Sequence, residues 1–401
     1  MTSFRTLKTL SLCLLIGLSG SLTAAELSSS RPERQGMSSE RLAQLDAVLN
    51  SYVEDGLIAG QVVLVLRKGR ITFSATNGMR NIEAGLPMTE DTLFRIASQT
   101  KAIVSTGIMI LHERGDLDIS HPLSRYFPQW TDMEVAVASG NGSYNLETAR
   151  RAITIRNLLT HTGGMSYGSG PASREWEAAG FQGWYFADKN VPIGESIAQM
   201  GALPLDAHPG EQWIYGYNTD ILGAVIEKAS GKSLSEFLTE EIFEPLGMDD
   251  TQFYVSDAEA ERLATVYQPD GNGGIEAIPA TNGMRSQGLY IDGPNISFSG
   301  GAGLTSTAND YARFLQMTLN GGQLDGERIL SRKTIELMTT NHLGNIPFRA
   351  GQGFGLGFYV VTDLGLRGSL GSVGEYGWGG AYPSTYWVDP EEELVVVYLT
   401  Q

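Results

Sequence analysis

RIASQTKAIVSTGIMIL, residues 95–111, contains the only Ser-x-x-Lys of the chain, Ser98 and Lys101, and continues into an almost uninterrupted apolar run. A serine and a lysine three residues apart lie on one face of a helix, close enough for the amine to reach the hydroxyl. The helix predicted for residues 100–114 is apolar nearly all round, which is typical of a buried helix. Four polar residues fall on one narrow stripe at helical spacing: Ser98, Lys101, Ser105 and His112.

A polar stripe on a buried helix needs partners or a chemical role, because an unpaired buried ammonium is costly. Burial disfavours the charged form of a lysine, so its amine becomes a proton acceptor. A base beside a hydroxyl makes an activated nucleophile. The same Ser-x-x-Lys pattern also occurs where a serine caps the start of a helix and the lysine is exposed to solvent. Other features of the chain are needed to distinguish the two interpretations.

Strand patterns occur at both ends of the chain. Strand-forming residues alternate over residues 60–78 around the turn Lys68-Gly69, which predicts a hairpin. Three more strands are expected near the end of the chain, at 358–361, 385–388 and 394–399. Between the two ends the pattern is mostly helical, with helices predicted at 38–55, 100–114, 154–160, 194–201, 218–229, 233–242 and 307–319.

These patterns predict an α/β (α+β) fold: one antiparallel sheet built from both chain ends and flanked by helices, with an inserted, mainly helical domain. We expect residues 26–96 and 300–401 to form the α/β domain and residues 97–299 to form the helical domain. The chain has 401 residues, of which 42% are hydrophobic and 18% charged, so it can bury a large core.

The first 25 residues are typical of a secretory signal. Arg5 and Lys8 precede the apolar run of residues 10–18, and Thr23-Ala24-Ala25 provides small residues for cleavage. The apolar run is too short for a stable membrane anchor. The only cysteine, Cys13, lies inside this segment, so the mature chain has no disulfide. We therefore expect a periplasmic or secreted bacterial protein.

The charge and the histidines exclude several classes of partner. A formal net charge of −17 disfavours nucleic acid and anionic membranes. The five histidines include no spacing typical of metal ligands, so we expect neither a metal nor another cofactor. The remaining class of partner is a small-molecule substrate.

Two further segments carry side chains that suit acyl transfer. In PGEQWIYGYNTDILG (209–223), Tyr215 stands where a loop enters a helix. It is either a core aromatic or, beside a lysine, a phenol that relays a proton. In YGWGGA (376–381), paired glycines allow the close backbone approach that N–H groups aimed at an oxyanion require, although a sharp turn between strands has the same composition.

With these segments the chain resembles the serine β-lactamase and penicillin-binding-protein superfamily, in particular the class C-like branch that includes the family VIII carboxylesterases. The resemblance covers residues 38–400 as one catalytic unit. It rests on five phrases that occur in order: LFRIASQTK (93–101), TIRNLLTHTGG (154–164), PGEQWIYGYNTDILG (209–223), GGAGLTSTANDYARF (300–314) and GWGGAYPSTYWVDP (377–390).

The resemblance implies roles for individual residues. Ser98 would be the nucleophile, Lys101 its base and Tyr215 the proton shuttle. The backbone N–H groups of Ser98 and Ala381 would form the oxyanion hole. The substrate would contact the residues around these groups: Trp378, Gly379, Gly380, Tyr217 and Asn218.

The chain departs from the β-lactamase pattern at two places. The tripeptide before the oxyanion strand begins with Trp378, where β-lactamases and peptidases carry a cation for the substrate carboxylate. The position two residues after Tyr215, normally asparagine, is Tyr217, and Asn218 follows it. An indole in place of a cation favours neutral acyl or alkoxy groups. Both departures favour esters over β-lactams.

A second serine motif competes with Ser98. Gly164-Met165-Ser166-Tyr167-Gly168 matches the G-x-S-x-G elbow of α/β-hydrolases. That elbow requires a buried strand before it and a helix after it, whereas this one follows a predicted helix and enters a loop. The neighbouring His161 is expected at the helix end, hydrogen-bonded in a turn.

Three functions remain open at this point. The favoured one is a serine hydrolase that cleaves carboxylic esters through an acyl-enzyme on Ser98. The second is a β-lactamase or D-amino-acid peptidase with the same chemistry. The third is a catalytically silent relative that only binds peptides or penicillin.

Overall fold

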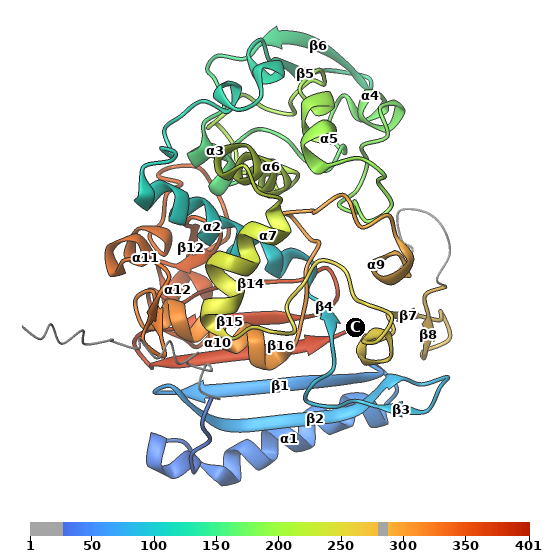
Figure 1. Ribbon diagram of the computed structural model, residues 1–401, viewed down its shortest axis with the longest axis vertical. Coiled ribbons are helices and arrows are strands. Elements are labelled where there is room, and N and C mark those ends of the chain that lie inside the picture. The colour runs from blue at the N-terminus through green and yellow to red at the C-terminus, as the bar shows by residue number, and fades with distance from the viewer. Residues whose placement is uncertain (1–26, 280–287) are drawn as a thin grey trace, which may run out of the picture.

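The strand patterns at the two chain ends join in one antiparallel eight-stranded sheet, in a computed structural model that describes residues 27–279 and 288–401. The order is β12-β13-β14-β15-β16-β1-β2-β3 (Figure 1). The strands are β1 (Gly60–Arg67), β2 (Arg70–Asn81), β3 (Leu86–Pro87), β12 (Gln352–Phe354), β13 (Tyr359–Val361), β14 (Tyr376–Gly379), β15 (Thr385–Asp389) and β16 (Leu394–Thr400). The predicted fold class is confirmed.

The junction between the chain ends is the β1–β16 pair, which runs from Gln61 opposite Thr400 to Arg67 opposite Leu394. The predicted hairpin between β1 and β2 turns at Lys68 and Gly69, with φ of 52° and 70°. Positive φ at both positions suits a two-residue hairpin loop, because its twist matches that of the strands. The sheet thus depends on contacts between residues that are more than 300 positions apart in the chain.

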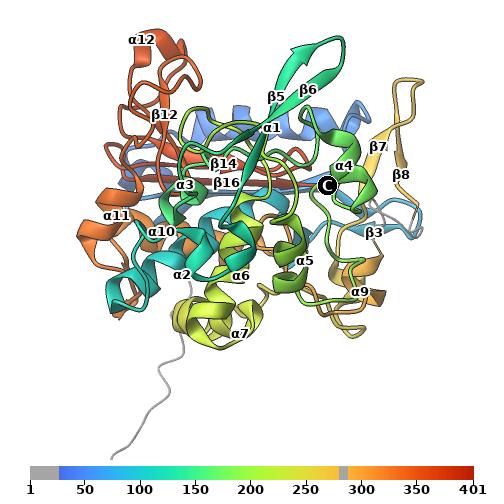
Figure 2. The same ribbon diagram turned by 90° about the horizontal axis from the view of Figure 1, so that it is seen from above.

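Helices cover both faces of the sheet. Helix α1 (Ser39–Glu54) lies on one face, and α10 (Ala308–Leu319) packs on β16 and β1 from the other (Figure 2). Beyond α10 lie α2 (Thr100–Arg114) and α6 (Asn218–Ser230), which pack on each other. The other helices are α3 (Ile155–Leu159), α4 (Ser173–Ala178), α5 (Ile193–Met200), α7 (Leu234–Leu238), α8 (Glu244–Leu246), α9 (Leu289–Asp292), α11 (Arg332–Met338) and α12 (Leu364–Arg367).

Helix α2 is the central helix of the helical layer. Every residue from Thr100 to Leu111 is buried, as its apolar composition predicts. At Gly107 an added Cβ would lie 3.0 Å from Ile226 of α6, so the glycine allows the two helices to approach closely. This packing fixes the first turn of α2, and with it Lys101, relative to α6.

The main element that the sequence did not predict is the hairpin of β5 (Glu134–Gly140) and β6 (Ser143–Thr148), in a region expected to be helical or loop. Most of β6 is exposed, so it lacks the alternation of apolar and polar residues that marks a half-buried strand. Short two-stranded pairings complete the fold: β4 (Phe94–Arg95) with β9 (Thr305–Ser306), β7 (Tyr267–Pro269) with β8 (Ile275–Ala277), and β10 (Gln323–Leu324) with β11 (Glu327–Arg328).

The predicted signal segment, residues 1–25, lies outside the described residues. Within residues 27–279 and 288–401, none of the helices has the length and apolar character needed to cross a membrane.

Candidate active site

Ser98 lies in the short 3-10 turn Ala97–Gln99, directly before α2, and is half-buried. The preceding Ala97 has φ of +44°, in the left-handed region that costs an alanine about 1 kcal/mol. The turn is held from both sides, because the Ile96 N–H donates to the Leu304 carbonyl and the Gln99 N–H to the Ile96 carbonyl, both at 3.0 Å. Such enforced backbone strain is common at functional sites.

The amine of Lys101 lies 3.2 Å from Ser98 Oγ, as the shared helix face predicts. It has two more partners, the Tyr167 hydroxyl at 3.0 Å and the Gly301 carbonyl at 2.7 Å. Lys101 is only 2% exposed, so these contacts replace water around the amine. The exposed-lysine interpretation of the motif is therefore wrong.

The chemistry of the three partners assigns the hydrogens around this amine. The Gly301 carbonyl can only accept, so it takes one N–H of Lys101. Burial above all, and then the nearby phenol of Tyr215, raises the pKa of Tyr167 well above 10, so Tyr167 remains a neutral phenol. Its oxygen can accept a second N–H. In a neutral amine the lone pair then faces Ser98 Oγ, where a general base is needed.

The Gly301 carbonyl is itself held in place by a buried carboxylate. Asp220, in the first turn of α6, accepts the Gly301 N–H at 3.0 Å and the Ser299 hydroxyl at 2.6 Å. Burial raises the pKa of Asp220, an effect that the nearby Lys101 and these hydrogen bonds oppose. Asp220 and Lys101 thus bind the two backbone groups of the same residue, the N–H and the carbonyl of Gly301.

Tyr215 stands on the other side of the amine. Its ring centroid is 4.6 Å from Lys101 Nζ, and its oxygen is 3.1 Å from Nε1 of Trp378 in β14. Because an indole N–H can only donate, the Tyr215 oxygen accepts this bond and its own O–H stays available to donate. The ring of His161 packs at 4.8 Å against Tyr215, and burial, then the charge of Lys101, lowers the pKa of His161 well below 6.5.

The end of β14 lies against the turn that carries Ser98. An added Cβ on Gly380 would lie 2.9 Å from the Ile96 carbonyl, so only glycine allows this approach. The Gly380 N–H donates to the Ser384 carbonyl at 2.8 Å. The next backbone N–H in the chain is that of Ala381. Ser98 and Ala381 line the same cleft, as two N–H donors of one oxyanion hole would.

The cleft is open and has a volume of about 500 Å³. It is lined by Ser98, Tyr167, Trp184, Tyr215, Arg349, Tyr359, Trp378, Gly379, Gly380, Ala381, Pro383, Ser384 and Thr385. The size suits a small organic substrate.

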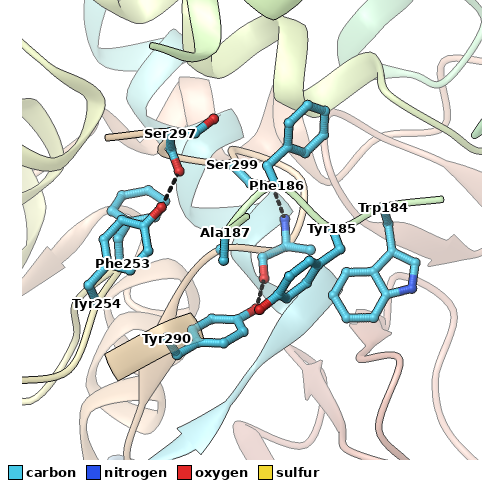
Figure 3. A pocket seen from close by; sticks show the side chains of 11 residues that line it. Trp184, Tyr185, Phe186, Ala187, Phe253, Tyr254, Tyr290, Ser297 and Ser299 are labelled. Carbon is cyan, nitrogen blue, oxygen red and sulfur yellow. Dashed lines mark hydrogen bonds between the residues drawn. The ribbon is translucent and has the colours of Figure 1, made fainter. Parts of the chain in front are cut away.

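A second cavity adjoins the cleft, since Trp184 lines both (Figure 3). It is walled by aromatic side chains, and two of its tyrosines bond to backbone: Tyr254 to the Ser297 carbonyl at 2.6 Å and Tyr290 to the Ala302 carbonyl at 3.2 Å. The cavity has room for about 10 Å³, enough for a single water. It therefore cannot take an acyl chain in this structure.

Tyr217 and Asn218 do not line the cleft, so the prediction that they contact the substrate is wrong. Tyr217 is 1% exposed, stacks on Trp176 and donates its hydroxyl to the Gly183 carbonyl at 2.6 Å. Asn218, at the start of α6, is fully buried and lies 3.2 Å from Nδ1 of His161. The turn into α6 directs both side chains into the core.

The competing motif around Ser166 does not form a nucleophile elbow. Its segment has neither a strand before it nor a helix directly after it. Ser166 Oγ accepts the Ser169 N–H at 3.0 Å, and the Ser166 N–H donates to Asp206 at 2.7 Å. The residue of this motif that lines the cleft and contacts Lys101 is instead Tyr167, which the sequence did not single out.

Tyr167→Phe should lower kcat by about 10- to 100-fold, because it removes one hydrogen bond to the amine that acts on Ser98. The lost hydrogen bond raises the activation free energy by about 1.5–3 kcal/mol if the loss appears only in the transition state. The ring contacts of Tyr167 with Tyr215 and Tyr217 would remain. Steady-state kinetics on a p-nitrophenyl ester, together with the melting temperature, check this. An unchanged kcat in a folded variant would show that Tyr167 does not orient Lys101.

Among the described residues, no three His, Cys, Asp or Glu side chains are grouped so that they could hold a metal ion.

Comparison with known proteins identifies the family of the chain. Residues 45–401 match the family model described as Beta-lactamase. The chain is 34% identical to Protein Rv1367c of Mycobacterium tuberculosis, over 88% of each chain, and 32% identical to Esterase EstB of Burkholderia gladioli, over 89% of this chain and 90% of EstB. Among solved structures it is similar to EstCE1, described as a hydrolase with promiscuous acyltransferase activity, with a TM-score of 0.77 and 29% identity over 90% of this chain and 93% of EstCE1. The chain therefore belongs to the β-lactamase family of hydrolases.

Proposed function

We propose that this protein hydrolyses carboxylic esters through an acyl-enzyme on Ser98. The observation that carries the proposal is the 3.2 Å contact between Lys101 Nζ and Ser98 Oγ at the floor of an open cleft. The similarity to proteins named as an esterase and as a hydrolase with acyltransferase activity supports it.

In the first half of the reaction, the Lys101 amine takes the hydroxyl proton and Ser98 Oγ attacks the ester carbonyl. The negative charge that develops on the carbonyl oxygen is stabilised by the N–H groups of Ser98 and Ala381. The C–O bond to the alcohol then breaks. Tyr215, whose O–H is available, donates its proton to the leaving alkoxide and regains one from Lys101.

In the second half, water attacks the acyl-enzyme carbonyl and gives up a proton to the same Lys101–Tyr215 pair. The bond to Ser98 Oγ breaks, Ser98 Oγ takes the proton back from the pair, and the carboxylic acid leaves. Trp378 has a defined place in this scheme, because its indole N–H orients the Tyr215 oxygen. A lysine at that position could not reproduce the indole's ring contacts with Tyr215 and Phe354.

The test against the second function, β-lactam hydrolysis, is a comparison of kcat/KM on p-nitrophenyl butyrate and on a chromogenic cephalosporin. We expect the ester to be preferred by at least about 100-fold, which corresponds to about 2.7 kcal/mol of transition-state binding. A preference for the cephalosporin would overturn the proposal in favour of a β-lactamase. Absence of turnover on both would favour a binding protein.

A further inference from the structure

One cation lines the cleft, and it comes from a segment that the sequence did not connect with the site. Arg349 precedes β12, and its guanidinium carbon lies 5.0 Å from the ring centroid of Trp378 and 5.2 Å from that of Phe348. It is the only charged side chain among the described residues that line the cleft. Trp378 in place of a cation therefore does not leave this part of the cleft without a positive charge.

The charge of Arg349 is not neutralised within the described part of the chain, where no carboxylate lies within ion-pair distance of it. The buried carboxylate of Glu375, directly before β14, has other partners. It pairs with Arg367 at 2.6 Å and accepts the Tyr359 hydroxyl at 3.0 Å. In a chain with a formal net charge of −17, an exposed arginine that lines the substrate cleft without a carboxylate partner attracts an anion.

The position of Arg349 indicates which part of an ester would reach it. The leaving alkoxide has to lie at the Tyr215 oxygen, from which it takes a proton. That oxygen is bonded to the Trp378 indole, and Arg349 lies on the ring of the same indole. Trp184 packs instead on Tyr382, beside the Ala97 and Ala381 end of the cleft. A substituent on the alcohol part of the ester therefore extends towards Arg349, and the acyl part extends away from it.

We propose that the alcohol part of the natural ester carries a carboxylate, which the Arg349 guanidinium binds at the Trp378 side of the cleft. The planar fork of arginine suits a carboxylate because it donates two parallel hydrogen bonds. Stacking on Trp378 and Phe348 restricts the side chain before substrate arrives, so less entropy is lost on binding. The inference rests on the proposed ester hydrolysis and adds the substrate class.

The experiment compares two acetate esters that differ only in charge on the alcohol part, 4-acetoxybenzoate and 4-acetoxybenzamide. Each releases acetate and a phenol that is followed by absorbance. The ratio of kcat/KM for the benzoate to kcat/KM for the benzamide is measured in the wild type and in Arg349→Gln. The wild-type ratio is then divided by the ratio of the variant, so that the different reactivities of the two phenols cancel. We expect this quotient to be about 10, mainly from a higher KM for the benzoate, because one exposed charge-assisted contact is lost.

Two variants and one change of conditions serve as controls. Arg349→Lys keeps the charge without the fork and should give an intermediate ratio. Arg41→Gln changes the net charge equally at an exposed position on α1, on the far face of the sheet, and should leave the ratio unchanged. Adding 0.5 M salt should lower the wild-type ratio towards that of Arg349→Gln, since an exposed charge pair is screened at about this ionic strength.

The other outcomes are informative in different ways. If both compounds are hydrolysed and the quotient stays near 1, the inference is overturned while the proposed function stands. If Arg349→Gln instead impairs only 4-nitrophenyl hydrogen glutarate, which carries its carboxylate on the acyl part, the assignment to the alcohol part is overturned. If the wild type hydrolyses neither these compounds nor p-nitrophenyl butyrate, the proposed function itself fails, and the inference with it.

Discussion

Ser98→Ala should lower kcat for p-nitrophenyl butyrate by at least about a thousand-fold, because Ser98 carries the serine or threonine hydroxyl of the cleft lining that contacts the Lys101 amine. Removal of a nucleophile from an acyl-transfer site leaves only the residual catalysis of the oxyanion donors. The substitution deletes one hydroxyl from a half-buried position and keeps the backbone of the turn, so the melting temperature should change little. Steady-state and burst kinetics measure the effect.

The matched control is Ser166→Ala, because Ser166 belongs to the competing serine motif. Its hydroxyl accepts only a backbone N–H in a loop, so activity should change by less than about threefold. If Ser98→Ala keeps most of its activity while Ser166→Ala loses it, the assignment of the nucleophile is wrong.

Lys101→Met should reduce the rate of acylation by about a thousand-fold. Methionine keeps the length and the burial of the side chain but has no amine to take the Ser98 proton. The Gly301 carbonyl and the Tyr167 hydroxyl lose their donor, so we also expect a loss of about 1–3 kcal/mol in the free energy of unfolding. Stopped-flow measurement of the p-nitrophenol burst separates acylation from this effect on stability.

Lys228→Met makes the same chemical change at an exposed position of α6 and should leave the burst unchanged. A folded Lys101→Met variant that is acylated at the wild-type rate would show that another group is the base. The alternatives are the two phenols beside the amine: Tyr167, with its hydroxyl 3.0 Å from Lys101 Nζ, and Tyr215, with its ring centroid 4.6 Å from it.

The sequence predicted those parts of the fold and site that depend on local pattern. Alternation of residues identified β1, β2, β15 and β16, and their antiparallel pairing follows from their positions at the two chain ends. Helical spacing brought Ser98 and Lys101 together, because residues three apart on a helix are neighbours in any fold.

The contacts that the sequence did not predict join residues far apart in the chain. Tyr167 is 66 residues from Lys101, and Gly301 is 200 residues from it, so no local spacing identifies them as its partners. Arg349 was missed for the same reason, since only the folded sheet brings it to Trp378. Such contacts depend on how helices and strands pack, and a single sequence contains that information only indirectly.

For Tyr217 and Asn218 the sequence predicted a place in the cleft that the structure does not show. Their closeness to Tyr215 in the chain suggested a shared role in the cleft. Yet α6 begins at Asn218, and successive residues of a helix point in directions about 100° apart. Asn218 therefore contacts His161 in the core, while Tyr215 faces the cleft.

The most direct test of Ser98 as the nucleophile is mass spectrometry of tryptic peptides after treatment with a fluorophosphonate. Trypsin separates the two candidate serines, because Ser98 falls in residues 96–101 and Ser166 in residues 157–174. We expect one adduct per chain, on the peptide IASQTK, in which Ser98 is the only serine. An adduct on the Ser166 peptide, or an active enzyme that gains no mass at Ser98, would contradict the account.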